Sequence, residues 1–329
     1  MMSSNDTLPR FADVLAAAAR IAAHARLTPI ASSRSLDAIS GARLHFKCEQ
    51  LQRVGAFKFR GACNAVFALD ADTAARGVVT HSSGNHGAAL ALASQLRGIA
   101  CHVVVPEGAV RSKLEAIEAS GAVLHRCAAN LSAREAACAQ VQADTGATLV
   151  HPYTTTEVIA GQGTAALELL TAHPDLDALV VPVGGGGLAA GTALTMQALA
   201  PNCRLFLAEP AGADDAAQSF ARGVLEHDVI PDTICDGLRA GMGAINFELL
   251  RNSNARVLTV DDAQTIAAMR LLWSRGKQLV EPSSATVLAA VLANSALFEG
   301  SKVGLILSGG NVDLDALPKL FALVTASAA

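Results

Sequence analysis

Short apolar runs rich in β-branched residues alternate with helix-like runs along most of this chain of 329 residues. Because helical patterns separate the apolar runs, the strands they predict must pair in parallel through crossover connections. The expected fold class is therefore α/β, with open twisted sheets that are mainly parallel. The predicted strands cover residues 42–49, 76–82, 99–106, 122–128, 176–183, 203–210, 256–260 and 302–310.

The strand–helix units fall into two clusters, which predicts two α/β lobes with a cleft between them. A small domain is expected over residues 53–148. A large domain is expected to combine both ends of the chain, residues 1–52 and 149–329. The large domain should carry the main ligand-binding loop, because the most glycine-rich turn of the sequence falls within it.

Composition narrows the range of functions. Hydrophobic residues make up 51% of the chain, which is ample for a buried core. The 25 basic and 29 acidic residues give a formal net charge of -4, so there is no basic excess to bind nucleic acid. The seven cysteines form no C-x-x-C pair and the N-terminus lacks an apolar secretion signal, so we expect reduced thiols and a cytoplasmic protein.

One stretch, residues 178–200, has no charge and is long enough to span a bilayer. It contains Pro182 and the four consecutive glycines Gly184, Gly185, Gly186 and Gly187, which a lipid-facing helix would not tolerate well. We interpret it as a buried strand, a tight loop and a helix. No membrane association is expected.

The same four glycines form the strongest candidate site. A glycine-rich turn between a strand and a helix directs backbone N–H groups at an anion, and the helix dipole favours negative charge. This predicts phosphate binding, although a tight turn without a ligand is the plainer alternative. Gly185, Gly187 and Ala190 also fit G-x-G-x-x-A, with Glu209 placed as a ribose-binding carboxylate. A nicotinamide-dependent oxidoreductase therefore stays open on this stretch.

Three further segments carry candidate chemistry. Lys58 lies between Phe57 and Phe59 and precedes Arg60, and such surroundings disfavour an ammonium ion and favour a nucleophilic amine. Taken alone, this lysine is as well explained by an ordinary side chain lying over phenylalanines. The segments 80–93 and 306–313 each place polar donors after a predicted strand, which suits an anion or merely a helix cap.

In this order, K-F-R-G at 58–61, S-S-G-N-H-G at 82–87, V-G-G-G-G at 183–187 and L-S-G-G-N at 307–311 resemble one family. It is the pyridoxal-phosphate enzymes of the tryptophan-synthase-β fold type (fold type II), in particular the serine/threonine dehydratases and serine racemase. The resemblance implies a cofactor in the cleft between the lobes and, commonly, a homodimer. It implies that Lys58 carries the cofactor as an imine and that Gly184–Gly187 bind its phosphate. Asn85 would bond the ring hydroxyl, Phe57 would pack on the ring, and Ser308 would face the ring nitrogen.

The activity implied is a dehydratase (ammonia-lyase) of β-hydroxy amino acids such as serine, threonine or 3-hydroxyaspartate, which gives a 2-keto acid and ammonia by β-elimination. The substrate carboxylate would be held by Ser82, Asn85 and His86. Arg134 matches an arginine that reaches the distal part of the substrate, which makes 3-hydroxyaspartate a serious candidate. The alternatives are a serine or aspartate-type racemase that uses Lys58 and Ser83 as two bases, and a cofactor-carrying protein without turnover.

The resemblance also implies a divalent cation. E-P-x-x-A-D-D at 209–215 matches a segment in which two carboxylates and one main-chain carbonyl bind the ion, here Glu209, Asp215 and Ala213. Oxygen ligands suit Mg²⁺, Mn²⁺ or Ca²⁺; the plainer alternative is a solvated acidic loop. Two positions depart from the family pattern. Ala240 replaces a serine that contacts substrate in serine racemase, which puts a preference for serine in doubt. Tyr153 takes a position that is usually small and polar.

Overall fold

The computed structural model describes residues 8–109, 111–226 and 228–326. The described residues form two compact units. Unit 1 comprises the described residues up to Arg26 and those within Lys58–Gln162, and unit 2 comprises Leu27–Phe57 and the described residues from Gly163 onward. Compared with the predicted boundaries, the residues before Leu27 and residues 149–162 lie in unit 1, and residues 53–57 lie in unit 2. These boundaries differ from the predicted ones because α1 and a very short strand, β6, both contact elements of unit 1. Helix α1 (Phe11–Ile21) contacts α3 (Lys58–Ala68), and strand β6 (Thr148–Leu149) pairs with β3 (Val78–Thr80).

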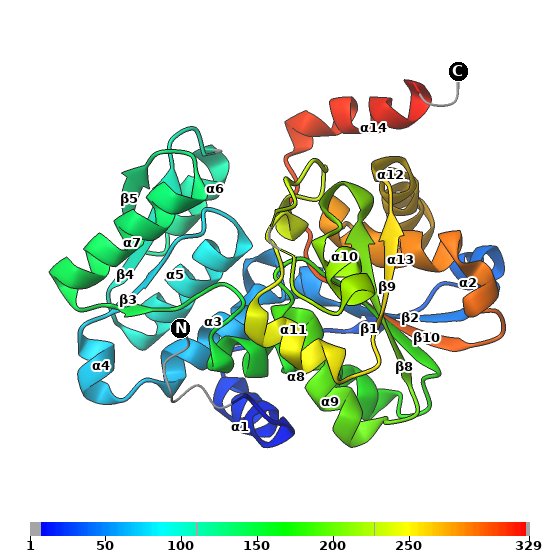
Figure 1. Ribbon diagram of the computed structural model, residues 1–329, viewed down its shortest axis with the longest axis horizontal. Helices are drawn as coiled ribbons and strands as arrows, with labels where there is room; N and C mark the ends of the chain where they lie inside the picture. Colours follow the sequence, from blue (N-terminus) through cyan, green and yellow to red (C-terminus); the bar gives the residue numbers. More distant parts are fainter. Residues whose placement is uncertain (1–7, 110, 227, 327–329) are drawn as a thin grey trace. The chain divides into compact units, whose positions relative to one another are not determined.

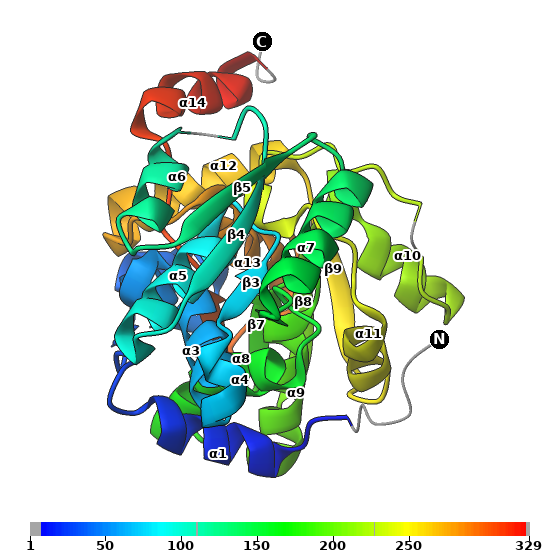
Figure 2. The ribbon, with the colours of Figure 1, turned by 90° about the vertical axis from the view of Figure 1, so that its left-hand side faces the viewer.

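Unit 1 is built on a four-stranded sheet in the order β5-β4-β3-β6, in which every pairing is parallel. Strand β4 contacts both α5 and α7, which lie on either side of the sheet in Figure 2. On the α7 side, Val79 and Val104 pack with Cys138 and Val141 in a buried cluster. The further elements of unit 1 are α4 (Ala71–Ala75), α5 (Asn85–Arg97), β4 (Cys101–Pro106), α6 (Arg111–Glu118), β5 (Val123–Cys127), α7 (Leu131–Thr145) and the first part of α8 (Thr156–Ala172).

Unit 2 is built on a six-stranded sheet in the order β1-β2-β10-β7-β8-β9 (Figure 1). All its pairings are parallel except that of β1 with β2. Its strands are β1 (Ile30–Ala31), β2 (Arg43–Cys48), β7 (Ala178–Pro182), β8 (Arg204–Pro210), β9 (Arg256–Val260) and β10 (Lys302–Leu307). Its helices are α2 (Arg34–Ser40), α9 (Gly187–Leu199), α10 (Asp215–Arg222), α11 (Ala244–Arg251), α12 (Asp262–Leu271), α13 (Pro282–Ala293) and α14 (Leu317–Ala326).

The core of unit 2 lies between its sheet and the helices α2, α12 and α13. Alternate residues of the central strands, such as Phe46, Val180 and Leu305, point into it and are almost fully buried. Helix α9 contacts β7, and Leu169 of α8 lies against Gly304 of β10. Strands covered on both faces explain the near-continuous apolar runs in the sequence.

The predicted α/β fold with mainly parallel sheets is confirmed. The uncharged stretch 178–200 forms β7, a glycine loop and α9, as predicted, and no helix in the described part of the chain is long and apolar enough to cross a membrane. Helix α12 ends at Leu271, and a π-helical turn follows over Leu272–Gly276. That turn lets the Trp273 indole N–H donate to the Val280 carbonyl at 3.0 Å.

Candidate active site

Unit 1 brings two histidine-bearing loops together at one edge of its sheet. Strands β3 and β6 are neighbours and parallel, so the residues that follow them emerge side by side. The rings of His81 and His151, one from each loop, have centroids 5.2 Å apart. A ring nitrogen of His86, in the first turn of α5, lies 3.1 Å from the Val150 carbonyl oxygen. The predicted residues Ser82 and Ser83 lie on the loop that follows His81, and Asn85 is the first residue of α5.

Lys58, the first residue of α3, belongs to the same cluster. Its Nζ donates a hydrogen bond to the carbonyl oxygen of Pro152, at 2.9 Å. Burial, followed by the nearby Lys58 charge, holds the pKa of His86 well below its usual value. Burial, His81 and Lys58 together lower the pKa of His151 to about 4. Both imidazoles are therefore neutral at pH 7, and the amine lies among groups that accept hydrogen bonds.

The start of α5 suits a carboxylate. Asn85 is its first residue and Gly84 its N-cap, which makes no side-chain capping hydrogen bond. The first amides of a helix lack partners within the helix, and its dipole favours negative charge there. The adjoining residues Ser82, Ser83 and Asn85 are half-buried, so an anion of small size can reach the amides.

Arg134 approaches this loop from α7. It is half-buried, and its positive charge adds to burial in lowering the pKa of His81. Tyr153 packs the edge of its ring against His151, with centroids 4.5 Å apart. Sequence reasoning singled out Arg134 and Tyr153 but missed His81 and His151. A usable signal was present, since each histidine follows a run that ends a strand of the unit 1 sheet.

Unit 2 carries the glycine loop between β7 and α9. Gly186 has φ +87°, and a Cβ on Gly184 would lie 2.8 Å from the Cα of Leu238. Two groups outside the loop hold it in place. Asn246 Nδ2 and the Gly243 amide donate hydrogen bonds to the Gly185 carbonyl, at 2.6 Å and 3.1 Å respectively. Only glycine fits this conformation and spacing at Gly184 and Gly186.

The amides of the loop are the feature that fits a phosphate. Residues Gly184 to Gly187 are buried, yet no described residue accepts a hydrogen bond from the amides of Gly184, Gly185 or Gly186. Buried N–H groups are costly without a partner, and here they adjoin the N-terminus of α9. A phosphate would supply the missing acceptors.

Ser308 emerges at the same edge of the sheet, because β10 and β7 are adjacent and parallel. It is buried, and its carbonyl accepts a hydrogen bond from the Phe57 amide at 2.9 Å. Ala56 also forms an antiparallel bridge with Gly309. Phe57, the residue before Lys58, is therefore anchored on the backbone of the Ser308 turn.

Comparison with known proteins shows the family to which this chain belongs. The family model of pyridoxal-phosphate dependent enzymes matches residues 21–309. The chain belongs to this family. It is 48% identical to the beta-hydroxyaspartate dehydratase of Paracoccus denitrificans, over 94% of this chain and 99% of that protein. It is 45% identical to the serine racemase of Dictyostelium discoideum, over 94% of this chain and 96% of that protein. The solved structure of maize serine racemase matches with a TM-score of 0.92 and 44% identity, covering 98% of this chain and 100% of that chain.

Membership of the pyridoxal-phosphate-dependent family answers the question that the glycine loop left open. Pyridoxal phosphate, rather than a nicotinamide dinucleotide, is the expected cofactor of this chain. The two carboxylate oxygens of Glu209 accept hydrogen bonds from the Ala216 and Ala217 amides, both at 2.8 Å, and each oxygen keeps a lone pair for a further ligand.

Glu209 and Asp215, the predicted cation ligands, are buried near one another in unit 2. Asp215 Oδ2 accepts a hydrogen bond from the Met242 amide at 2.7 Å. Burial raises the pKa of Glu209 to about 8, the amides of Ala217 and Ala216 oppose this, and the charges of Asp215 and Asp214 add to it. Within the described residues, no three side chains among His, Cys, Asp and Glu form a metal-binding group. A cation here would need the Ala213 carbonyl, the third ligand that the sequence predicted, and water to complete its coordination.

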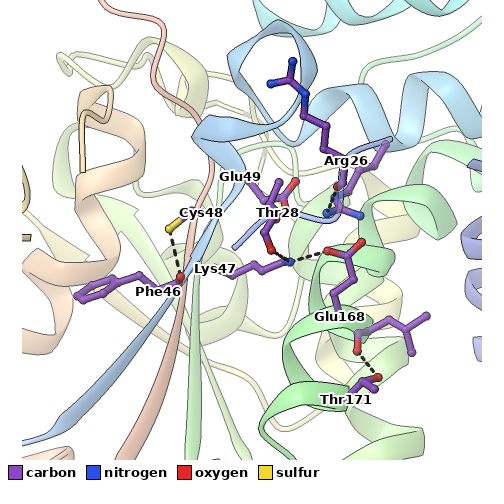
Figure 3. Close-up of polar contacts among 10 residues, drawn as sticks. Arg26, Thr28, Phe46, Lys47, Cys48, Glu49, Glu168 and Thr171 are labelled. Atoms are coloured by element: carbon purple, nitrogen blue, oxygen red, sulfur yellow. Dashed lines mark hydrogen bonds and ion pairs between the residues drawn. The ribbon is translucent and has the colours of Figure 1, made fainter. Parts of the chain in front are cut away.

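A buried lysine, Lys47 in unit 2, is engaged in an ion pair (Figure 3). Its Nζ donates to Glu168 Oε2 at 2.5 Å and to the Thr28 carbonyl at 2.7 Å. The Thr28 hydroxyl in turn donates to Glu49 at 2.5 Å. These contacts occupy the Lys47 amine, so Lys47 does not compete with Lys58 for the role of reactive amine.

Proposed function

We propose that this protein is a pyridoxal-phosphate-dependent dehydratase of β-hydroxy amino acids. The observation that carries the proposal is the placing, within unit 1, of the Lys58 amine beside two neutral histidines and the start of α5. The likeness to a beta-hydroxyaspartate dehydratase supports it. Release of 2-keto acid and ammonia from the isomers of serine, threonine and 3-hydroxyaspartate tests it. An enzyme inert on all of them would contradict the proposal.

The predicted cofactor-binding residues each contact a different part of pyridoxal phosphate in this proposal. The amides of Gly184–Gly187 hold the cofactor phosphate, and Phe57 packs on its ring. Asn85 bonds the ring hydroxyl, and Ser308 faces the ring nitrogen with a neutral hydroxyl. When bound, pyridoxal phosphate supplies an electron sink that acidifies the α-hydrogen of the attached amino acid.

The protein groups then direct the elimination. The substrate carboxylate lies at the start of α5, held by Ser82, Asn85 and His86. The Lys58 amine, which lies next to His86, takes the α-hydrogen as general base. The β-hydroxyl would take up a proton and leave as water, and hydrolysis of the resulting enamine by one water would give the 2-keto acid and ammonia.

We further propose 3-hydroxyaspartate as the preferred substrate. Its second carboxylate needs a cation, and Arg134 supplies one close to His81, directly before the loop that holds the first carboxylate. Ala240 and Tyr153 depart from the serine racemase pattern and agree with a substrate other than serine.

Replacing Arg134 with alanine should lower kcat/KM for 3-hydroxyaspartate by about 100-fold, the effect of losing a charge-assisted pair with a carboxylate. Activity on serine, which lacks the second carboxylate, should change by less than about threefold. Arg111→Ala, which removes an exposed arginine of unit 1, is the matched control. Equal losses on both substrates would contradict the role of Arg134.

A second activity, racemisation, is supported by the serine that follows Ser82. Ser83 is half-buried on the loop before α5, and a serine racemase is among the similar proteins. With Lys58 as one base, Ser83 acts as the second, on the opposite face of the substrate. Ser83→Ala should then reduce racemisation of an L-amino acid at least about 100-fold and leave elimination within about threefold. Parallel loss of both activities, measured by chiral chromatography and keto-acid release, would argue against two bases.

We propose that a divalent cation, Mg²⁺, Mn²⁺ or Ca²⁺, binds Glu209, Asp215 and the Ala213 carbonyl. Two buried carboxylates that raise each other's energy are relieved by a cation between them. Chelation should lower the melting temperature by several degrees, an effect expected of losing a bound ligand. Asp215→Ala should lower it similarly and remove the response to chelator. A melting curve that chelator leaves unchanged would contradict the site.

The proposal also includes a homodimer in the cytoplasm. All seven cysteines are free thiols, which agrees with a reducing compartment. Sedimentation of the purified protein as a stable monomer would contradict the dimer.

A further inference from the structure

Val54, four residues before Lys58, has a backbone conformation that valine rarely adopts. Its φ is 55° and its ψ is 15°, in the left-handed region. A β-branched side chain is disfavoured there, and residues held in such conformations occur where surrounding structure imposes them. The structure must therefore contain groups that hold Val54.

Those groups come from the turn that contains Ser308. Asn311 Nδ2 donates to the Val54 carbonyl at 2.7 Å. The Gly310 amide donates to the Gly55 carbonyl at 2.9 Å, and Phe57 donates to Ser308 at 2.9 Å. The backbone before Lys58 is thus fixed in register on residues 308–311, all within unit 2.

Asn311 is itself held in place. Its amide donates to Glu281 Oε2 at 3.0 Å, and the Glu281 amide donates to the Gly309 carbonyl at 3.1 Å. Glu281 is buried, so its carboxylate is a fixed acceptor. The Oδ1 of Asn311 lies 2.6 Å from the place where a Cβ on Gly55 would be, which leaves Gly55 no room for a side chain.

We propose that Asn311 is a positioning residue for Lys58, and the inference rests on the proposed role of Lys58. By holding Val54 in the left-handed conformation, Asn311 fixes the register in which Phe57 and Lys58 leave the Ser308 turn. When the Asn311 side chain is removed, Val54 relaxes to an ordinary backbone conformation and the segment from Val54 to Phe57 shifts. The amine then reaches its working position in only a fraction of molecules.

The test introduces Asn311→Ala into the unchanged protein and into a Val54→Gly protein. Glycine at position 54 adopts a positive φ without the hydrogen bond from Asn311. The first readout is the rate at which full-length protein freed of cofactor gains near-visible absorbance when pyridoxal phosphate is added. The second is the division of the effect between kcat and KM. Asn311→Ala alone should lower the rate of cofactor uptake and kcat about tenfold, from the strain that a non-glycine residue bears in this region, with KM within about twofold. In the Val54→Gly background the same change should cost less than about threefold.

Asn252→Ala is the matched control, because the Asn252 side chain also donates to a backbone carbonyl, that of Glu248 at 3.0 Å, but at an exposed site. It should change neither readout. If Asn311→Ala is insoluble, Asn311→Asp keeps the shape but removes the donor and gives the same comparison.

A lower melting temperature with unchanged uptake and kcat would reduce Asn311 to a structural residue and overturn the inference. An equal loss in the Val54→Gly background would overturn it too. Failure of the unchanged protein to take up pyridoxal phosphate would instead contradict the proposed function, and this inference with it.

Discussion

Replacing Lys58 with alanine is expected to abolish the near-visible absorbance of the cofactor-loaded protein and to lower elimination activity at least about 10³-fold. The reason is that, in the proposed function, the one amine serves both as the covalent anchor of the cofactor and as the base. Lys58→Arg should lose both properties equally, because a guanidinium is not a nucleophile. It would keep the positive charge and could keep the hydrogen bond to the Pro152 carbonyl. Absorbance spectra and keto-acid release measure both losses.

Lys302→Ala is the control for this prediction, since Lys302 is a partly exposed lysine paired with Asp175 in unit 2. It should keep both the colour and the activity. A Lys58→Ala protein that retained the absorbance would show that another residue anchors the cofactor.

Replacing Gly186 with alanine is expected to weaken pyridoxal-phosphate binding at least about 100-fold, because two costs add. The new side chain is strained at φ +87°, and its Cβ would lie 2.9 Å from the Cβ of Asn246. Asn246 donates a hydrogen bond to the Gly185 carbonyl, so a shift of Asn246 would disturb the amides that we propose bind the phosphate. Titration of cofactor-free protein with pyridoxal phosphate measures the change.

Gly300→Ala is a control that introduces the backbone strain without a steric clash. Gly300 has φ +71°, but no atom lies within 4 Å of its added Cβ. This control should lower stability slightly and leave cofactor affinity unchanged. Affinity that survived in Gly186→Ala would show that the loop does not bind the phosphate.

Much of the fold was predictable because the central strands are buried on both faces. Such strands appear in the sequence as continuous apolar runs, and β2, β7, β8 and β10 all begin and end within a few residues of the predicted bounds. The loop between β7 and α9 was also predictable, because four consecutive glycines separate an apolar strand pattern from a helix pattern. Its role in anion binding stays a prediction.

Other features depend on long-range contacts that carry no local signal. Strands β1 and β6 have two residues each, too few for a period to appear. Without β6 the boundary of the small domain fell before residue 149 rather than after it. The hydrogen bond from Lys58 to Pro152 and that from Asn311 to Val54 join residues 94 and 257 positions apart, and neither pairing could be read from spacing.

The most direct test of the account is to locate the covalent attachment of the cofactor. Protein loaded with pyridoxal phosphate is reduced with borohydride, digested and mapped by mass spectrometry. The account predicts one pyridoxyl phosphate group per chain, on Lys58, with Lys47 and Lys302 unmodified. Modification of any other lysine in its place, or no stable attachment at all, would contradict it.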